Sequence, residues 1–200
     1  MRMRPMDQRS PIVGPVRALG LTLVLTGALA ACGTSEEVAP VVAADLPGDL
    51  CSLVPPSVVE RWSLAVEDQH VRGGESVKQA MCSMSGMSAG EAVTLEVRLT
   101  SYGGADVESA RSVALGTLAD SCADLEASGV GTFQDSETGC TRTSLDEPAS
   151  ERGRVVDVHR AIPSRGVIRV EMSHSGQNWQ LVAPEVVAVS GTVGQTDFDA

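Results

Sequence analysis

Hydrophobic residues occupy every second position in the stretch AVTLEVRLTSY, residues 92–102. The apolar members are Val93, Leu95, Val97 and Leu99, and a polar residue stands between each pair. A period of two sends successive side chains to opposite faces of a strand. The stretch therefore predicts a β-strand with one face in the core and one polar face.

The spacing of apolar residues becomes helical directly after this strand. Between residues 105 and 128 they recur every three or four positions, which is typical of a helix with one buried stripe. The members of the stripe are Val107, Ala110, Ala114, Leu118, Cys122 and Leu125. The pattern predicts a helix that turns Cys122 toward the core.

Residues 153–175 predict a β-hairpin with a three-residue loop, Pro163-Ser164-Arg165. This register sets Val158 opposite Val170 and Val156 opposite Met172 on one face. Cross-strand pairs on the other face are polar. They involve Asp157, His159, Arg169 and Glu171.

The remaining pattern is shorter and alternates between the two types of element. Pro55 and Pro56 precede a helix start at Ser57, with Val58, Val59 and Trp62 along one side. A turn at 72–76 leads to a strand through Cys82, and a further strand is expected around Cys140. A last helix is expected within 177–191, and residues 191–200 are expected to fray. This order predicts an α+β fold, an antiparallel sheet with helices packed on one face.

The predicted domain is small and its core is poor in aromatic residues. Residues 49–190 suit a single domain in length. The aromatic residues of the whole chain are Trp62, Tyr102, Phe133, Trp179 and Phe198. Valine, leucine and alanine bury less surface per residue than aromatic side chains do. A core of this kind benefits from covalent cross-links.

The amino terminus has the layout of a bacterial lipoprotein signal. Four arginines precede an uncharged run at 18–31, which is too short to span a bilayer comfortably. The run closes on Leu29-Ala30-Ala31-Cys32, which looks like a lipobox. We expect cleavage after residue 31, acylation of Cys32 with diacylglycerol and palmitate, and a flexible tether at 32–48. The alternative is an ordinary signal peptide that leaves Cys32 as a free thiol.

Four cysteines remain after Cys32, an even number in a chain predicted to be exported. Such a set predicts two disulfides, and the sequence allows three pairings. Pairing between neighbours, Cys51 with Cys82 and Cys122 with Cys140, needs only local loop closure and ranks first. A zinc site is the competing use, but Cys-x-x-Cys pairs are absent from the sequence. No metal or other cofactor is expected.

Charge narrows the range of partners. The first 31 residues hold four of the 15 basic residues and one of the 26 acidic ones, which leaves 11 bases, 25 acids and a net charge of −14. Nucleic-acid binding needs basic patches, so it is not expected. Adhesion to anionic lipid by overall charge is not expected either. Contact with the membrane is assigned to the lipid on Cys32.

Several motifs together resemble one family. The segment DLCSLVPPSVVERW, the pair Gly73-Gly74 and the tetrapeptide MCSM around Cys82 are similar to the small actinobacterial lipoproteins grouped as domain of unknown function 3558. Cys51-Ser52-Leu53 and Cys82 match the Cys-x-Leu and Cys-x-Trp positions of that family, with Met84 in place of the tryptophan. The resemblance covers roughly residues 45–190. It implies a cell-envelope lipoprotein and, because the family has no assigned activity, no catalytic residues.

The polar face of the hairpin is the one place that suggests catalysis. His159 oriented by Glu171 has the residue types of a general base in an envelope hydrolase. A hydrolase of the common serine type also needs a nucleophile on a sharp turn, as in Gly-x-Ser-x-Gly, and this chain lacks the motif. A solvated face with mixed charges is the favoured interpretation, and His70 and His174 are expected at the surface.

Met81, Met84 and Met87 suggest a second chemistry. Thioethers prefer Cu(I), a metal handled outside the cytoplasm. A regular strand, however, sends Met84 to the face opposite Met81 and Met87. Methionine also fills irregular cores. The methionines are therefore expected to be structural, with copper binding kept as an alternative.

These observations predict a lipid-anchored protein on the extracytoplasmic face of the cell membrane. It is expected to bind a partner protein or a small envelope ligand without catalysis. A cavity of several hundred cubic ångströms favours a small ligand, whereas a filled core favours surface recognition.

Overall fold

The structure is a computed structural model of the whole chain. It describes residues 39–128, 131–143, 154–163, 165–175 and 182–195. Glu37–Ala200 forms one compact unit that contains all of these residues. The predicted signal segment, the lipobox and Cys32 lie outside the described residues.

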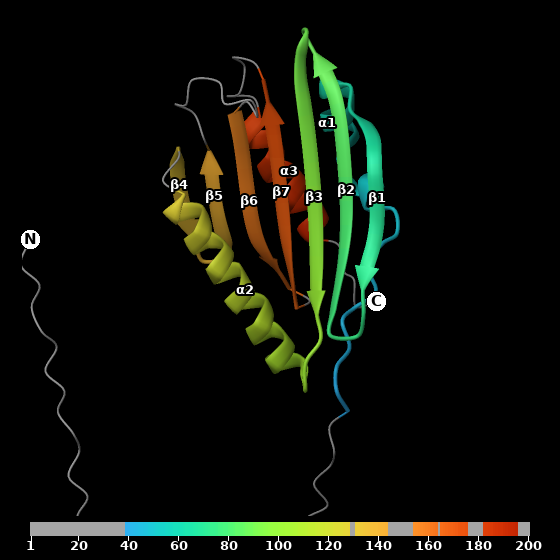
Figure 1. Cartoon of the computed structure of the whole chain (residues 1–200), viewed down its shortest axis with the longest axis vertical. Helices are drawn as coiled ribbons and strands as arrows, with labels where there is room; N and C mark the ends of the chain where they lie inside the picture. The colour runs from blue at the N-terminus through green and yellow to red at the C-terminus, as the bar shows by residue number, and fades with distance from the viewer. Residues whose placement is uncertain (1–38, 129–130, 144–153, 164, 176–181, 196–200) are drawn as a thin grey trace, which may run out of the picture. The chain divides into compact units, whose positions relative to one another are not determined.

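Seven strands among the described residues form one antiparallel sheet in the order β1-β2-β3-β7-β6-β5-β4 (Figure 1). The strands are β1 (Ala65–Gly73), β2 (Val77–Ser88), β3 (Glu91–Tyr102), β4 (Thr132–Ser136), β5 (Gly139–Thr143), β6 (Arg154–Ile162) and β7 (Gly166–His174). Hairpins join β1 to β2, β2 to β3, β4 to β5 and β6 to β7. The predicted α+β class and antiparallel sheet are confirmed.

Helices pack against both faces of this sheet. The 3-10 helix η1 (Leu50–Leu53), α1 (Pro56–Trp62) and α3 (Val182–Gly194) share one face, and α2 (Val107–Ala127) crosses the other (Figure 1). The shared face agrees with the prediction, whereas the position of α2 differs from it. The reason is a second, smaller core, in which Ala114 and Leu118 of α2 pack against Tyr102 and Val167.

The main core lies between the sheet and the pair α1 and α3. All four apolar residues of the predicted alternating strand are at most 1% exposed, so the period-two prediction for β3 is confirmed. Val186 and Val189 of α3 are fully buried against the same face. At ~25 cal/mol per Å² of apolar surface removed from water, this face supplies most of the hydrophobic stabilisation.

The hairpin β6–β7 has the predicted register, with Val158 opposite Val170 and Val156 opposite Met172. Its loop leaves Arg165 at a φ of 68°, in the left-handed region. Three-residue hairpin loops commonly place one residue there, and glycine adopts that conformation most easily. The chain therefore keeps a bulky cation where the backbone favours glycine.

Strand β1 was not predicted. Its burial pattern has no alternation, because eight of its nine residues are exposed and it forms one edge of the sheet. The pairing with β2 shifts between Val66 and Asp68, which is a β-bulge. Bulges and charged side chains on an edge strand hinder pairing with other chains. An edge strand of this kind lacks the hydrophobic period on which the sequence prediction relied.

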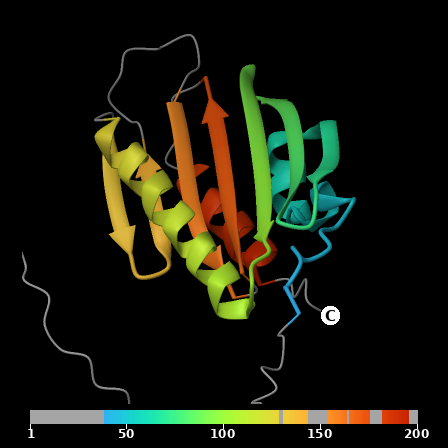
Figure 2. The ribbon, with the colours of Figure 1, turned by 60° about the horizontal axis from the view of Figure 1, so that its bottom comes forward.

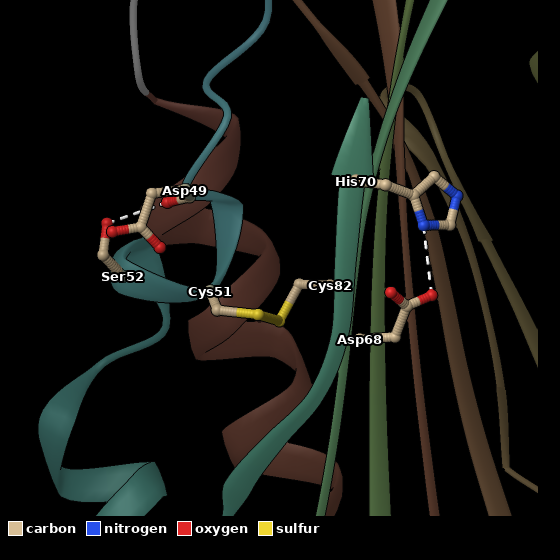
Figure 3. Close-up of a disulfide and its surroundings, with 6 residues drawn as sticks. All are labelled: Asp49, Cys51, Ser52, Asp68, His70 and Cys82. Atoms are coloured by element: carbon tan, nitrogen blue, oxygen red, sulfur yellow. Dashed lines mark hydrogen bonds and ion pairs between the residues drawn. A yellow bond between two sulfur atoms is a disulfide. The ribbon is translucent and has the colours of Figure 1, made fainter. Parts of the chain in front are cut away.

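Both disulfides join cysteines that are neighbours along the chain, which confirms the pairing ranked first among the three possible ones. Cys51–Cys82 ties η1 to β2, and Cys122–Cys140 ties α2 to β5. The Cα atoms lie 5.2 and 5.8 Å apart, respectively. Figure 3 shows the Cys51–Cys82 bridge on the core side of the strands, with Asp68 and His70 on the opposite side. On each face of the sheet, one disulfide thus links a strand to a helix that packs against that face.

The described part of the predicted tether is docked on the folded body. Val41 forms a β-bridge with Gly104, and Ala43 is 1% exposed. The amide of Ala44 donates to the hydroxyl of Ser101 at 2.8 Å. The folded unit therefore begins before the predicted boundary at residue 49, because small residues fit closely beside the ends of β2 and β3.

The predicted frayed tail at 191–200 also begins too early. Helix α3 continues to Gly194, and Val193 is completely buried in the main core. Packing of Val193 in the core holds this last turn in the helix despite the glycines at 191 and 194. Among the described residues, no helix combines the length and apolar character that crossing a membrane requires.

Candidate functional site

The polar face of β3, β7 and β6 carries like charges directly opposite one another. Glu96 lies opposite Glu171, which lies opposite Asp157, and these form a row of three carboxylates. In the next row Arg98 lies opposite Arg169, which lies opposite His159. Like charges in opposite positions destabilise a sheet unless other charges offset them. Here each row supplies the counter-charges of the other.

Asp157 is the centre of this network. Its side chain is 1% exposed and accepts hydrogen bonds from Arg142 Nη2 at 2.8 Å and Arg169 Nη2 at 3.3 Å. Arg142 also donates to the hydroxyl of Ser128, just after α2. Buried carboxylates need such partners, because desolvation without them is expensive. The network therefore ties β5, β6 and β7 to the end of α2.

His159 is buried beside this network and is not on a solvated face. It is 6% exposed, opposite Cys140 of the disulfide that joins α2 to β5. Desolvation, followed by the charge of Arg169, lowers its pKa to about 4. The ring is therefore neutral at pH 7. The expected solvated interpretation was wrong for His159 and Asp157, because α2 covers this side of the sheet.

The burial of His159 implies a pH-dependent stability. An unfolded histidine titrates near 6.5, so between pH 6.5 and 4 the unfolded chain binds a proton that the folded chain excludes. Stability should fall across this window by about 3 kcal/mol, at 1.36 kcal/mol per pKa unit. Urea unfolding at pH 7, 5.5 and 4.5 measures it, and His159→Gln should remove this loss.

Glu171 acts with the opposite sign. Desolvation, then the charge of Asp157, raises its pKa above 4.5. On acidification the folded state therefore takes up this proton first, which adds stability. Glu171→Gln should make the acid loss steeper than in the parent chain. If Glu171→Gln and His159→Gln left the pH profile unchanged, the burial of both groups would be contradicted.

The geometry gives little support to the hydrolase alternative. A general base must reach the proton it abstracts, and the His159 ring lies under α2. His159 is opposite Arg169, while Glu171 is opposite Asp157, so the predicted orienting pair is diagonal. His159 also lines a small hollow of about 140 Å³ together with Cys140 and Ser190.

The methionines and the two other histidines singled out in the sequence lie in different environments in the structure. Met84 is buried and Met87 is 62% exposed on the opposite face of a strand with regular register, so the three methionine sulfurs do not converge. His70 is partly exposed and contacts Asp68 at 3.1 Å. His174 was expected at the surface but is 1% exposed, because the alternation of β7 continues to its last residue and packs the ring 5.1 Å from Trp62.

A cleft lies at the hairpin end of the sheet, the end that Figure 2 brings forward. Its volume is about 470 Å³. One wall comes from the first half of α2, with Ala114 and Leu115, and the other from the end of α3, with Gly191 and Gly194. The hairpin β6–β7 lies between these two helices, which cover opposite faces of the sheet, and its turn lines the cleft as well. The cleft is thus built from elements far apart in the sequence.

The lining of this cleft is mostly apolar, apart from its cations. Ala161, Ile162 and Pro163 contribute apolar surface from the hairpin. The charged residues are Arg111, Arg160 and Arg165, and no described carboxylate lines the cleft. Thr138 and Gln195 complete the set of polar side chains. An apolar hollow with a few convergent polar groups is the usual form of a small-molecule site.

A second hollow on the other side of α2 has the opposite charge. It measures about 350 Å³ and includes Glu126, Asp135 and Glu137, with no described cation in its lining. The chain as a whole has more acidic than basic residues. The three arginines in the lining of the larger cleft are therefore a local feature that the overall composition does not explain.

The cleft arginines were not singled out from the sequence. The available signal was weak: Arg160 and Arg165 flank the predicted hairpin loop, which places them at the same end of the sheet. Arg111 lies on the predicted helix, whose position across the sheet the periodicity does not specify. The four disulfide cysteines, in contrast, are brought together as predicted.

The chain matches no protein-family model, no curated protein and no solved structure. The resemblance to the lipoprotein family therefore stays a prediction.

Proposed function

We propose that this chain is a non-catalytic binding protein, anchored by lipid on Cys32 to the extracytoplasmic face of the cell membrane. The cleft between α2 and α3 takes its ligand, a small molecule with an apolar part. The volume of about 470 Å³ supports this proposal most directly. Sites for small molecules generally fall between about 300 and 1,000 Å³.

The supporting observations agree in their chemistry. Apolar side chains line most of the cleft, so an apolar ligand gains from leaving water. His159, the candidate general base, is only 6% exposed, which favours binding over hydrolysis. The lipobox and two disulfides support an extracytoplasmic location, as does the resemblance to envelope lipoproteins.

Gly191 offers a direct way to fill the cleft. A Cβ atom at this position meets nothing within 4 Å, so a larger side chain extends into open space. Gly116 of α2 is a matched control, because it also faces open space but does not line the cleft. Both substitutions replace a helical glycine, so their effects on helix propensity are similar.

Calorimetric titration of residues 37–200 with 1-decanol, an uncharged probe, tests the proposal. The unit folds around its own core and holds both disulfides, so it can be produced without the anchor. We expect Gly191→Leu to weaken decanol binding at least tenfold, while Gly116→Leu leaves the affinity unchanged. Equal affinity in the parent chain and Gly191→Leu would overturn the proposed site.

A further inference from the structure

Building on the proposed function, we infer that the ligand of the cleft is a single-chain amphiphile with an anionic head. The acyl chain lies along the apolar lining, and a carboxylate or phosphate is bound by Arg111, Arg160 and Arg165. Arginine suits this role because its planar fork of donors matches both head groups.

The three arginines approach the cleft from separate elements. Arg111 belongs to α2, Arg160 to β6 and Arg165 to the hairpin loop. Cations that line one cleft repel one another unless anions offset them. Among the described residues, the lining supplies no carboxylate for Arg111 or Arg160, although acids outnumber bases in this chain by 26 to 15.

Most arginines elsewhere in the described residues pair with a carboxylate, and Arg72 bonds to the amide of Gln79. Arg61 pairs with Glu185, Arg98 with Glu96, and Arg142 with Asp157. Arg111 and Arg160, in contrast, form no ion pair with any described carboxylate. Their positive charge is thus available to a ligand, which distinguishes the cleft from the polar network under α2.

The hairpin loop places Arg165 beside the cleft. Its φ of 68° is in the left-handed region, which three-residue hairpin loops commonly use for one residue. Arg165 Nη1 also donates to the carbonyl oxygen of Val42 at 3.2 Å, which holds the side chain at the mouth.

That contact connects the cleft to the predicted anchor. Val42 follows Cys32 by ten residues, and an extended chain of ten residues spans at most about 35 Å. If Cys32 carries lipid, the arginine end of the unit cannot move farther than this from the membrane surface. Membrane amphiphiles with anionic heads are therefore within reach of this end of the unit.

Three ten-carbon probes of equal chain length separate the head group from the chain. Decanoate and decyl phosphate carry the anionic head, and 1-decanol carries the chain alone. Each probe is titrated into residues 37–200. We expect decanoate and decyl phosphate to bind at least tenfold tighter than decanol. Inorganic phosphate and acetate serve as the free-anion arm, and they should bind far more weakly because they lack the chain.

Arginine variants then assign the head group. Arg111→Gln, Arg160→Gln and Arg165→Gln should each weaken the two anionic probes by roughly five- to tenfold and leave decanol unchanged, because only the charge-assisted hydrogen bonds are lost. Arg72→Gln is the matched control, since Arg72 lies on edge strand β1 and bonds to Gln79.

The outcomes separate this inference from the proposed function. One outcome is that decanol binds, that Gly191→Leu blocks this binding, and that the anionic probes bind no tighter than decanol. The cleft would then be a ligand site, but the inference of an anionic head group would be wrong. If no ten-carbon probe binds, both fail. If free phosphate bound as tightly as decyl phosphate, the acyl chain would contribute nothing, and the inference of an amphiphilic ligand would also be overturned.

Discussion

Replacing Asp157 by alanine should destabilise the protein by about 3–5 kcal/mol, the largest loss that we expect from a single substitution. The carboxylate is 1% exposed and accepts hydrogen bonds from both Arg142 and Arg169. Its removal leaves Arg142, whose side chain is 18% exposed, without its carboxylate, and takes one of two carboxylates from Arg169. Losing one partner of a largely buried pair costs more than the pair itself is worth. Urea unfolding at pH 7 measures the change in the free energy of unfolding.

A surface pair on the same face provides the control. Glu96 bonds to Arg98, and the two side chains are 36% and 31% exposed. Because solvent screens such pairs, Glu96→Ala should cost less than about 1 kcal/mol. Equal losses for Asp157→Ala and Glu96→Ala would show that Asp157 is not the centre of a buried network. Asp157→Ala should also lower the pKa of Glu171, because one cause of its rise disappears.

Loss of the Cys51–Cys82 bridge should destabilise the protein by about 2–5 kcal/mol. The bridge closes a separation of 31 residues, and cross-links of this length restrict the unfolded chain substantially. Both cysteines are also buried in the main core, at 5% and 0% exposure. The double substitution Cys51→Ala with Cys82→Ala, followed by urea unfolding, gives the value without a free thiol.

The second bridge is the comparison. Cys122–Cys140 closes a separation of 18 residues, and Cys122 is only partly buried. Its double alanine variant should therefore lose less stability than the Cys51 and Cys82 variant. The reverse order, or no loss in either variant, would contradict the structural role assigned to the bridge under α1 and α3.

Elements with a buried face were predictable, because burial imposes a period on the sequence. Strand β3 alternates over eight residues, and the β6–β7 hairpin has the predicted register down to the pairs Val158–Val170 and Val156–Met172. The pairing of cysteines was predictable for a related reason. Neighbours along the chain close the shortest loops, and the structure shows that pairing.

Elements whose positions depend on contacts between distant segments were not predictable. Edge strand β1 is exposed and carries no period, and residues 41–46 dock through backbone hydrogen bonds and small side chains. The helical period of α2 correctly indicates the buried residues Ala110, Ala114 and Leu118, but a period cannot say which face of a sheet the helix covers. Val107, placed in the same stripe, is 58% exposed at the helix start.

The candidate site illustrates the same limit. His159 and Glu171 attracted attention in the sequence because their residue types suggest catalysis, yet burial makes them part of a structural network. The cleft depends on Arg111, Arg160 and Arg165, which look like ordinary surface cations in the sequence. Only the packing of α2 and α3 around the hairpin end places them in the lining of one cleft.

Photolabelling in the native membrane tests the central claim most directly. The full-length protein would be produced in its own cells, exposed to a diazirine-bearing fatty acid, irradiated and analysed by mass spectrometry. We expect an amino-terminal peptide that begins at acylated Cys32, and label on peptides that contain Leu115, Ile162 or Gly191. An unmodified Cys32, or label confined to peptides outside the cleft, would contradict it.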